Sequence, residues 1–308
     1  MNTHDIIPNP ITGPAIRVGL LSDIHHELMT DAAEQHLLPE LSDGMALSNP
    51  DIAIFAGDVD RAGQAVRTAT ELAPAVPVIA SIGGNHEHYR TGEPIDAGLA
   101  RMREQARQLS AVQQRTVLAL EDDCQIVDIR GIGVRILGAT LWTDYDLNGN
   151  QAEDSRLVAR ALNDYRFITG QDGRSFSPDE AFRRHEASTA FLRRELETPF
   201  DGPTVVITHH LPSMRSIAPR YHGRPDNAGF ASNRDDLLEL GAALWVCGHT
   251  HSSHHYRDRS GTLVVCNPCG YAIDRKKGLP IRENAAFVPG MSVDIIRKPD
   301  GTWSAEIS

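Results

Sequence analysis

Residues 17–25 have the sequence Arg17-Val18-Gly19-Leu20-Leu21-Ser22-Asp23-Ile24-His25, an apolar run followed by a turn that carries a carboxylate and an imidazole. A short apolar run that is bounded by turn residues is typical of a buried strand. In open α/β sheets, ligand sites form at the carboxyl ends of the strands. The stretch therefore predicts a strand that ends at a functional site.

Four further apolar runs end in the same way, at Gly57-Asp58, Gly84-Asn85-His86-Glu87, Thr208-His209-His210 and Gly248-His249-Thr250-His251. Ten of the 14 histidines lie in four short windows (25–26, 86–88, 209–210 and 249–255), which is more than chance placement would give. Imidazole mixed with carboxylate and amide oxygen suits manganese, iron or zinc, whereas calcium prefers oxygen ligands alone. The five segments together predict a transition-metal site.

Strand-like runs and helical segments alternate in the first part of the chain, and strands follow one another later. This order predicts an α/β fold with parallel strands first and antiparallel pairing afterwards. The predicted helices are 64–72, 95–109 and 178–196, the last with a capping box at Ser177 and Glu180. Its expected buried face holds Phe182, Ala187, Ala190, Phe191 and Leu196. The predicted strands are 17–21, 51–56, 77–82, 125–129, 134–139, 204–208, 243–247, 262–266, 292–297 and 302–307.

No linker, repeat or low-complexity tract divides the 308 residues, so we predict one domain, 1–308. Two stretches, 144–201 and 211–232, have the character of insertions that form walls or a cap over the site. Long loops of this kind in a compact domain are usually functional.

The chain carries a net charge of −11, which counts against binding to nucleic acid or to an anionic membrane. The first 18 residues lack the basic and apolar regions of a signal peptide, and no apolar run is long enough to span a bilayer. We therefore expect a cytoplasmic protein with a small-molecule partner. The oligomeric state stays open.

Four cysteines are expected to be thiols, and two of them form Cys266-Asn267-Pro268-Cys269. This pair ends a strand-like run instead of opening a helix, which disfavours a redox motif. A zinc site would need a second pair of ligands, and the sequence shows none beside it. His254 and His255 are expected on a solvated turn.

The ordered motifs D-x-H, G-D, G-N-H-E, H and G-H-x-H, with the later Asn267-Pro268-Cys269-Gly270-Tyr271, resemble the calcineurin-like metallophosphoesterase superfamily. The resemblance implies a four-layer α-β-β-α sandwich of two facing mixed β-sheets flanked by helices. It also implies that one metal takes Asp23, His25 and His251, that the other takes Asn85, His209 and His249, and that Asp58 bridges them. His86 would not bind metal but would face the phosphoryl or leaving-group oxygen.

Two metal ions a few ångströms apart lower the pKa of a bridging water and align a phosphoric ester for in-line attack by the resulting hydroxide. A protonated His86 can then stabilise or protonate the departing oxygen. We therefore expect a dinuclear phosphoric ester hydrolase that uses Mn, Fe or Zn ions bridged by Asp58 and a hydroxide.

The substrate is less defined by the sequence. The segment Gly57-Asp58-Val59-Asp60-Arg61-Ala62-Gly63 departs from the G-D-x-x-D-R-G signature of protein phosphatases, and a long loop could hold a second ester group. Both features favour a small-molecule phosphodiester. A phosphomonoesterase and a non-catalytic binding scaffold on the same fold remain alternatives.

Several neighbours of the expected ligands have predicted roles of their own. Glu87, His26 and His88 are expected to orient ligands. His210 is expected to orient ligands in the same way and is also a candidate substrate contact. Arg220 and Arg224 either grip an anionic group of the substrate or belong to a solvated loop.

Overall fold

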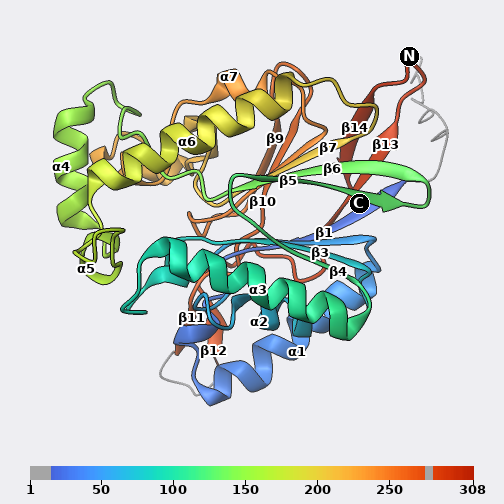
Figure 1. Ribbon diagram of the computed structural model, residues 1–308, viewed down its shortest axis with the longest axis horizontal. Coiled ribbons are helices and arrows are strands. Elements are labelled where there is room, and N and C mark those ends of the chain that lie inside the picture. Colours follow the sequence, from blue (N-terminus) through green and yellow to red (C-terminus); the bar gives the residue numbers. More distant parts are fainter. Residues whose placement is uncertain (1–14, 275–279) are drawn as a thin grey trace, which may run out of the picture.

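Two six-stranded sheets pack face to face in the computed structural model, which describes residues 15–274 and 280–308 (Figure 1). The first sheet holds β1 (Ile16–Leu21), β2 (Ile52–Ala56), β3 (Val78–Ile82), β4 (Thr116–Leu120), β13 (Ser292–Arg297) and β14 (Trp303–Ile307), in the order β14-β13-β1-β2-β3-β4. The second holds β5 (Asp123–Ile129), β6 (Ile132–Ala139), β7 (Thr204–Thr208), β8 (Leu244–Cys247), β9 (His254–Arg257) and β10 (Leu263–Cys266), in the order β5-β6-β7-β8-β10-β9. A separate ribbon pairs β11 (Ala272–Asp274) with β12 (Pro280–Arg282).

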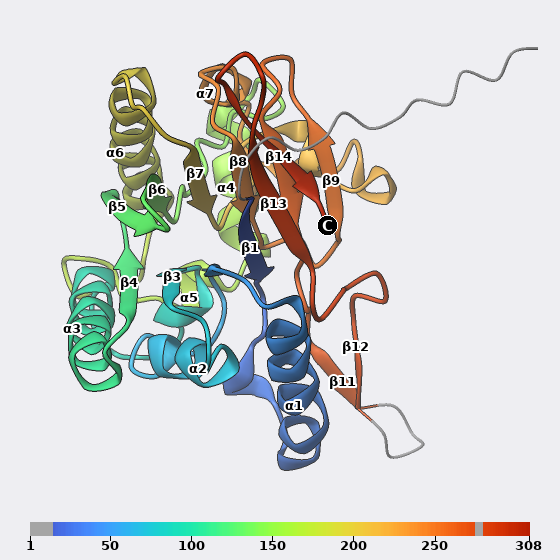
Figure 2. The same ribbon diagram turned by 90° about the vertical axis from the view of Figure 1, so that its right-hand side faces the viewer.

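Both sheets combine parallel strands with antiparallel strands, which lie at one edge of the first sheet and at both edges of the second. Strands β1 to β4 run parallel, and β13 and β14 continue that sheet antiparallel. Strands β6, β7, β8 and β10 run parallel, with β5 and β9 antiparallel at the edges. Helices cover the outer faces (Figures 1 and 2). The predicted sandwich of two mixed sheets flanked by helices is therefore confirmed.

The central strands are apolar along their whole length because both of their faces are buried. Alternate residues such as Val18, Ile54 and Ile136 point between the sheets and form one core cluster. The intervening residues, Phe55 and Trp245 among them, pack under the helices and belong to a second cluster. These continuous runs made the central strands readable in the sequence.

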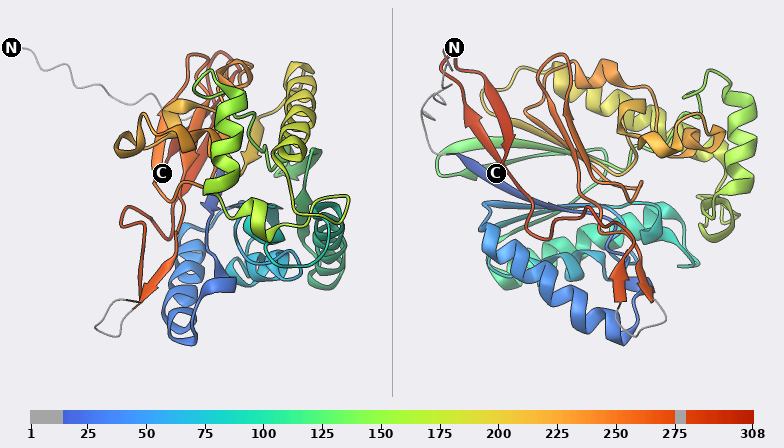
Figure 3. Two further views of the ribbon diagram at one scale, coloured as in Figure 1. Left: turned by 90° about the vertical axis from the view of Figure 1, so that its left-hand side faces the viewer. Right: turned by 180° about the vertical axis from the view of Figure 1, so that it is seen from behind.

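The helices form the two outer layers and one end of the molecule. They are α1 (Asp31–Ser48), α2 (Ala65–Leu72), α3 (Ile95–Gln113), α4 (Gln151–Ala161), α5 (Asp164–Phe167), α6 (Pro178–Glu197) and α7 (Asp235–Leu238). Helices α1 to α3 cover the first sheet, and α6 and α7 cover the second (Figure 1). Helices α4 and α5 stand together at one end of the sandwich (Figure 3). No helix in the described ranges combines the length and apolar character that crossing a membrane requires.

Most of the predicted elements are present, but the sequence missed others and misplaced some side chains. Helix α1 was missed because Pro39 lies inside it, and proline normally interrupts a helix. Strand β4 was missed, and His254 and His255 lie in strand β9 instead of a turn. Ser177 caps α6 as expected, accepting a hydrogen bond from Glu180 N at 3.2 Å. However, Ala187 and Ala190 of that helix are exposed, and His185 and Leu192 are buried in their place.

The two predicted insertions contain most of the remaining structure. Residues 144–201 supply α4, α5 and α6, and residues 211–232 supply three short 3-10 helices, Met214–Ser216, Pro219–Tyr221 and Pro225–Gly229. Two more 3-10 turns, His26–Leu28 and His86–His88, follow β1 and β3. Residues 1–14, which include most of the stretch examined for a signal peptide, lie outside the described residues.

Gly138 of β6 faces the first sheet at a point that leaves no room for a side chain. A Cβ there would lie 2.4 Å from Leu120 Cβ and 2.9 Å from Ile82 Cγ2. We predict that Gly138→Ala lowers the free energy of unfolding by about 1–3 kcal/mol, because a close-packed core does not shift cheaply. Gly133→Ala on the same strand is the control, since its Cβ would meet its nearest neighbour at 3.6 Å. Equal denaturant midpoints for the two variants would contradict this account of the packing.

Candidate metal centre

Five turns, each directly after a parallel strand, converge on one buried spot between the sheets. Asp23 and His25 follow β1, Asp58 follows β2, and Asn85 follows β3. His209 follows β7, and both His249 and His251 follow β8. The two sheets are joined here by a bridge between Ser22 and Pro268 and by a hydrogen bond from His249 N to Asp23 Oδ1 at 2.9 Å. The structure thus brings together all seven side chains that the sequence proposed as ligands.

The backbone at these turns is strained. Five of the seven residues have a positive φ, between 44° and 71°: Asp23, His25, Asp58, His249 and His251. For residues other than glycine this conformation is uncommon and costs on the order of 1–3 kcal/mol each, and it clusters at functional sites. The strain aims the five side chains at a common point, which indicates that their placement matters more than local stability.

The first group of ligands consists of Asp23, His25 and His251, whose ligand atoms all lie within 4.8 Å of one another. The Nε2 atoms of His25 and His251 face each other at 3.0 Å, and His251 Nε2 is 3.5 Å from Asp23 Oδ1. Two ring nitrogens and a carboxylate that converge in this way are a donor set suited to a transition metal.

The second group consists of Asp58, His209 and His249, also within 4.8 Å of one another. His209 Nε2 lies 3.4 Å from Asp58 Oδ2 and 3.1 Å from the side-chain oxygen of Asn85, which adds a fourth donor. His249 Nε2 is buried and has no hydrogen-bond partner among the described residues. A buried nitrogen left unpaired in such a donor set fits a metal ion.

Asp58 lies between the two groups. Its Oδ2 atom is 3.4 Å from His209 Nε2 of the second group and 3.8 Å from His25 Nε2 of the first. Its Oδ1 atom accepts a hydrogen bond from His86 N at 2.8 Å. The carboxylate is therefore positioned to be shared by two metal ions.

Outer partners orient the ligand atoms toward the centre. The carbonyl of Ala56 accepts from His209 Nδ1 at 2.9 Å, which leaves the Nε2 lone pair free for a metal. Asp164 accepts from Asn85 Nδ2 at 2.8 Å, so the amide oxygen points inward. Glu283 Oε2 lies 2.6 Å from His251 Nδ1, which leaves Nε2 of that ring directed toward the centre.

The electrostatics of the centre favour bound cations. Burial lowers the pKa of His209, but the carboxylate of Asp58 more than offsets this and raises it to about 10. Burial likewise lowers the pKa of His251, and hydrogen bonds to Asp23 and Glu283 raise it to about 10. The carboxylates thus hold protons on these rings in the absence of metal. Because ligands must be deprotonated, metal binding has to displace those protons.

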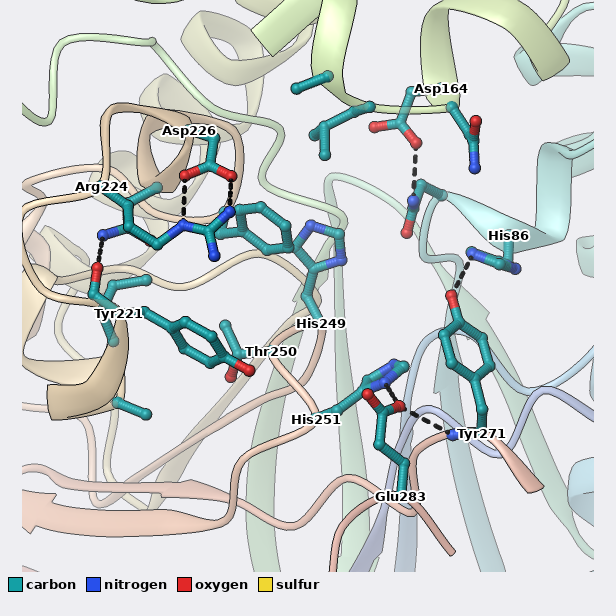
Figure 4. A pocket seen from close by; sticks show the side chains of 18 of the residues that line it. His86, Asp164, Tyr221, Arg224, Asp226, His249, Thr250, His251, Tyr271 and Glu283 are labelled. Carbon is teal, nitrogen blue, oxygen red and sulfur yellow. Dashed lines mark hydrogen bonds and ion pairs between the residues drawn. The ribbon is translucent and has the colours of Figure 1, made fainter. Parts of the chain in front are cut away.

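His86 sits at the edge of the centre. Its Nδ1 is 2.9 Å from Glu27 Oε1, its Nε2 is 3.4 Å from the Tyr271 hydroxyl, and its ring stacks on Tyr89. One of its ring nitrogens also lies within 4.8 Å of a ring nitrogen of His25 and a carboxylate oxygen of Asp58. The ring therefore stands beside both ligand groups and lines the cavity next to them (Figure 4).

A cavity of about 340 Å³ opens above the centre. His86, His249 and His251 line its floor, residues 161–164 and 217–230 contribute its walls, and Tyr271 and Glu283 close one side (Figure 4). Among the three expected substrate contacts, Arg224 lines the cavity. Arg220 lies outside it and donates to Ser252 Oγ, whereas His210 is buried behind His249, with its ring 4.4 Å away.

The sequence did not identify several side chains that shape the centre. Glu27 comes two residues after His25, a proximity that could have indicated it. Asp164 and Glu283 come from distant elements and follow no motif, so only the fold connects them to Asn85 and His251. Of the neighbours expected to orient ligands, Glu87 contacts two ligand turns, whereas His26 pairs with Asp60 at 2.8 Å.

Comparison with known proteins gives a family and a fold. The family model for calcineurin-like phosphoesterases matches residues 16–253. A phosphopantetheinyl hydrolase from Mycobacterium tuberculosis has a similar structure, with a TM-score of 0.62, 19% identity, and coverage of 89% of this chain and 98% of that one. A dimetal phosphatase from Danio rerio gives a TM-score of 0.46 and 17% identity, with coverage of 82% and 87%. Comparison with curated protein sequences gives no significant match.

Glu87 ties two ligand turns together. Its buried carboxylate accepts hydrogen bonds from the backbone N–H groups of Asp58, Val59 and Gly84, at 3.0, 2.9 and 2.7 Å. We predict that Glu87→Gln weakens metal binding about 10- to 100-fold, because the amide group turns one acceptor into a donor that faces a backbone N–H. Competition with a chelator, followed by metal release, measures this. Glu71→Gln on the exposed side of α2 is the control, and equal affinities for the two variants would rule out the proposed tie.

Proposed function

The chain belongs to the calcineurin-like phosphoesterase family, and from that premise we propose that it hydrolyses a small-molecule phosphodiester at a centre of two metal ions. One observation carries the proposal: the buried carboxylate of Asp58 lies between two ligand groups, and His249 and His251 of those groups line a cavity of about 340 Å³. A cavity of that volume is in the range of small-molecule sites.

The donor sets support one assignment of ligands. One ion would be held by Asp23, His25 and His251, the other by Asn85, His209 and His249, and Asp58 would bridge the two. Mixed nitrogen and oxygen donors favour Mn, Fe or Zn. When bound, such a pair supplies Lewis acidity and an activated water.

His86 is the proposed proton donor to the leaving alcohol. Burial lowers its pKa, but the Asp58 and Glu27 carboxylates outweigh this effect and raise it. Glu27 accepts from Nδ1, so Nε2 is the nitrogen that faces the cavity beside the Tyr271 hydroxyl. This arrangement supports proton transfer from Nε2 when the ester bond breaks.

The charges around the cavity support a diester over a monoester. Arg224 is the single Lys or Arg among the described residues that line it, and Asp226 binds its guanidinium through two hydrogen bonds, at 2.9 and 2.5 Å (Figure 4). Asp164 and Glu283 are also in the lining. A phosphomonoester carries nearly two negative charges at neutral pH and a diester only one, so the diester meets less repulsion here.

The shape of the cavity supports an organic group beyond the phosphate. Leu162, Ile217, Tyr221 and Phe230 give its outer part an apolar lining that the alcohol groups of a diester could fill. The similar structure from Mycobacterium tuberculosis is that of a phosphopantetheinyl hydrolase. Since 19% identity shows the fold alone, a phosphopantetheinyl ester belongs in a substrate panel as one test compound among others.

We predict that His86→Ala loses about 10²- to 10⁴-fold in kcat on an aryl phosphate ester, because the negative charge that develops on the phosphoryl and leaving-group oxygens then lacks the hydrogen-bond donor at Nε2. Metal analysis of the same variant should still find two ions per chain. Assays of bis(p-nitrophenyl) phosphate and p-nitrophenyl phosphate with Mn²⁺, Fe²⁺ and Zn²⁺ measure the effect and the ester preference together.

The outcomes of this assay separate the alternatives. A higher kcat/KM on the diester supports the proposal, and a higher kcat/KM on the monoester replaces it with the phosphomonoesterase. Full activity after exhaustive chelation would contradict the metal-dependent reaction. Two bound metals without turnover of any ester would instead favour a binding scaffold.

A further inference from the structure

A second group of potential metal ligands lies in the second sheet, apart from the seven side chains already described. The ligand atoms of Cys247, His254 and Cys266 all lie within 4.8 Å of one another. Both cysteines are fully buried, and His254 is half-buried. We propose that these three side chains form a separate site for a thiophilic ion of the Zn²⁺ class.

Strand pairing places the three residues in one row. Cys266 at the end of β10 is in register with Cys247 at the end of β8 on one side, and with His254 at the start of β9 on the other. Residues in register on neighbouring strands point to the same face of a sheet. The row therefore presents two sulfurs and an imidazole side by side. The sequence could not reveal it because the residues are separated along the chain and β9 was not expected.

The distances are close to those that a tetrahedral ion needs. Bond lengths of about 2.3 Å to sulfur and 2.0–2.1 Å to nitrogen put the ligand atoms of such a site roughly 3.6–3.8 Å apart. Cys247 Sγ and His254 Nε2 are 4.0 Å apart, so small rotations of the side chains would close the site. The structure contains no disulfide among the described residues, which leaves both sulfurs free to bind.

A backbone hydrogen bond orients the His254 imidazole for metal binding. The carbonyl of Ser252 accepts from His254 Nδ1 at 3.1 Å, which leaves the Nε2 lone pair directed at the sulfurs. The same arrangement, a backbone carbonyl behind the ring, directs His209 toward the dinuclear centre. The hydroxyl of Thr250 is buried and has no hydrogen-bond partner among the described residues. A water would complete the coordination.

The site would steady the two turns that leave β8 and β10. Cys247 directly precedes the turn with His249 and His251, and Cys266 directly precedes Asn267 and Pro268, which contact the end of β1. An ion bound to this row would fix three strand ends beside the dinuclear centre. Thiolate ligands distinguish it from that centre, whose expected donors are all nitrogen and oxygen.

Cobalt is the probe that separates the two sites. Metal-free full-length protein, titrated with Co²⁺, should develop a near-ultraviolet sulfur-to-cobalt charge-transfer band, because thiolate coordination produces one and the dinuclear centre has no thiolate. Cys266→Ser should weaken the band by half or more, because one of the two thiolates is lost, and Cys124→Ser should leave it unchanged. His254→Ala, which replaces a half-buried side chain and tests the site without emptying the core, should weaken Co²⁺ binding roughly tenfold or more, whereas His255→Ala should not.

Three results would overturn the proposal: no such band in the wild-type protein, a band of unchanged intensity in Cys266→Ser, or only two free thiols in the unreduced, denatured chain. The last result would indicate a disulfide between Cys247 and Cys266 instead. None of these outcomes depends on whether the dinuclear centre hydrolyses phosphodiesters.

Discussion

Asp23 and Asp58 are buried carboxylates at the place where the two sheets meet. The rest of the centre has to compensate their negative charge. No Lys or Arg in the described part of the chain pairs with either, and their ionic partners are imidazoles. Buried charges without partners cost several kcal/mol each, so this place needs cations. Protons on His209 and His251 meet the need in part, and two metal ions would meet it fully. A net charge of −11 is therefore compatible with an anionic substrate, since two bound metal ions would make the site locally positive.

The fold satisfies this requirement through its parallel strands. Parallel strands end at the same edge, so five turns from two sheets reach one point without long loops. The Glu87 carboxylate ties two of the turns together, which offsets part of the cost of the strained positive φ at five ligand positions. Outer partners such as Ala56 and Asp164 then leave each ligand with one free donor atom.

The sequence was informative where function and local structure coincide. Each expected ligand directly follows an apolar strand, so the motif and the strand could be recognised together. The fold adds what sequence separation hides: Glu27 behind His86, Glu283 behind His251, and the row of Cys247, Cys266 and His254 across three strands. Elements with weak patterns were also hidden, such as α1 with its internal proline and the half-exposed β9.

Crystallographic anomalous scattering from the Mn²⁺- or Zn²⁺-loaded protein tests the central claim most directly. The account predicts two peaks about 3.5–4 Å apart, as in other two-metal sites, on either side of the Asp58 carboxylate. One peak should contact Asp23, His25 and His251, and the other should contact Asn85, His209 and His249. A single peak, or two peaks that do not share Asp58, would contradict the account.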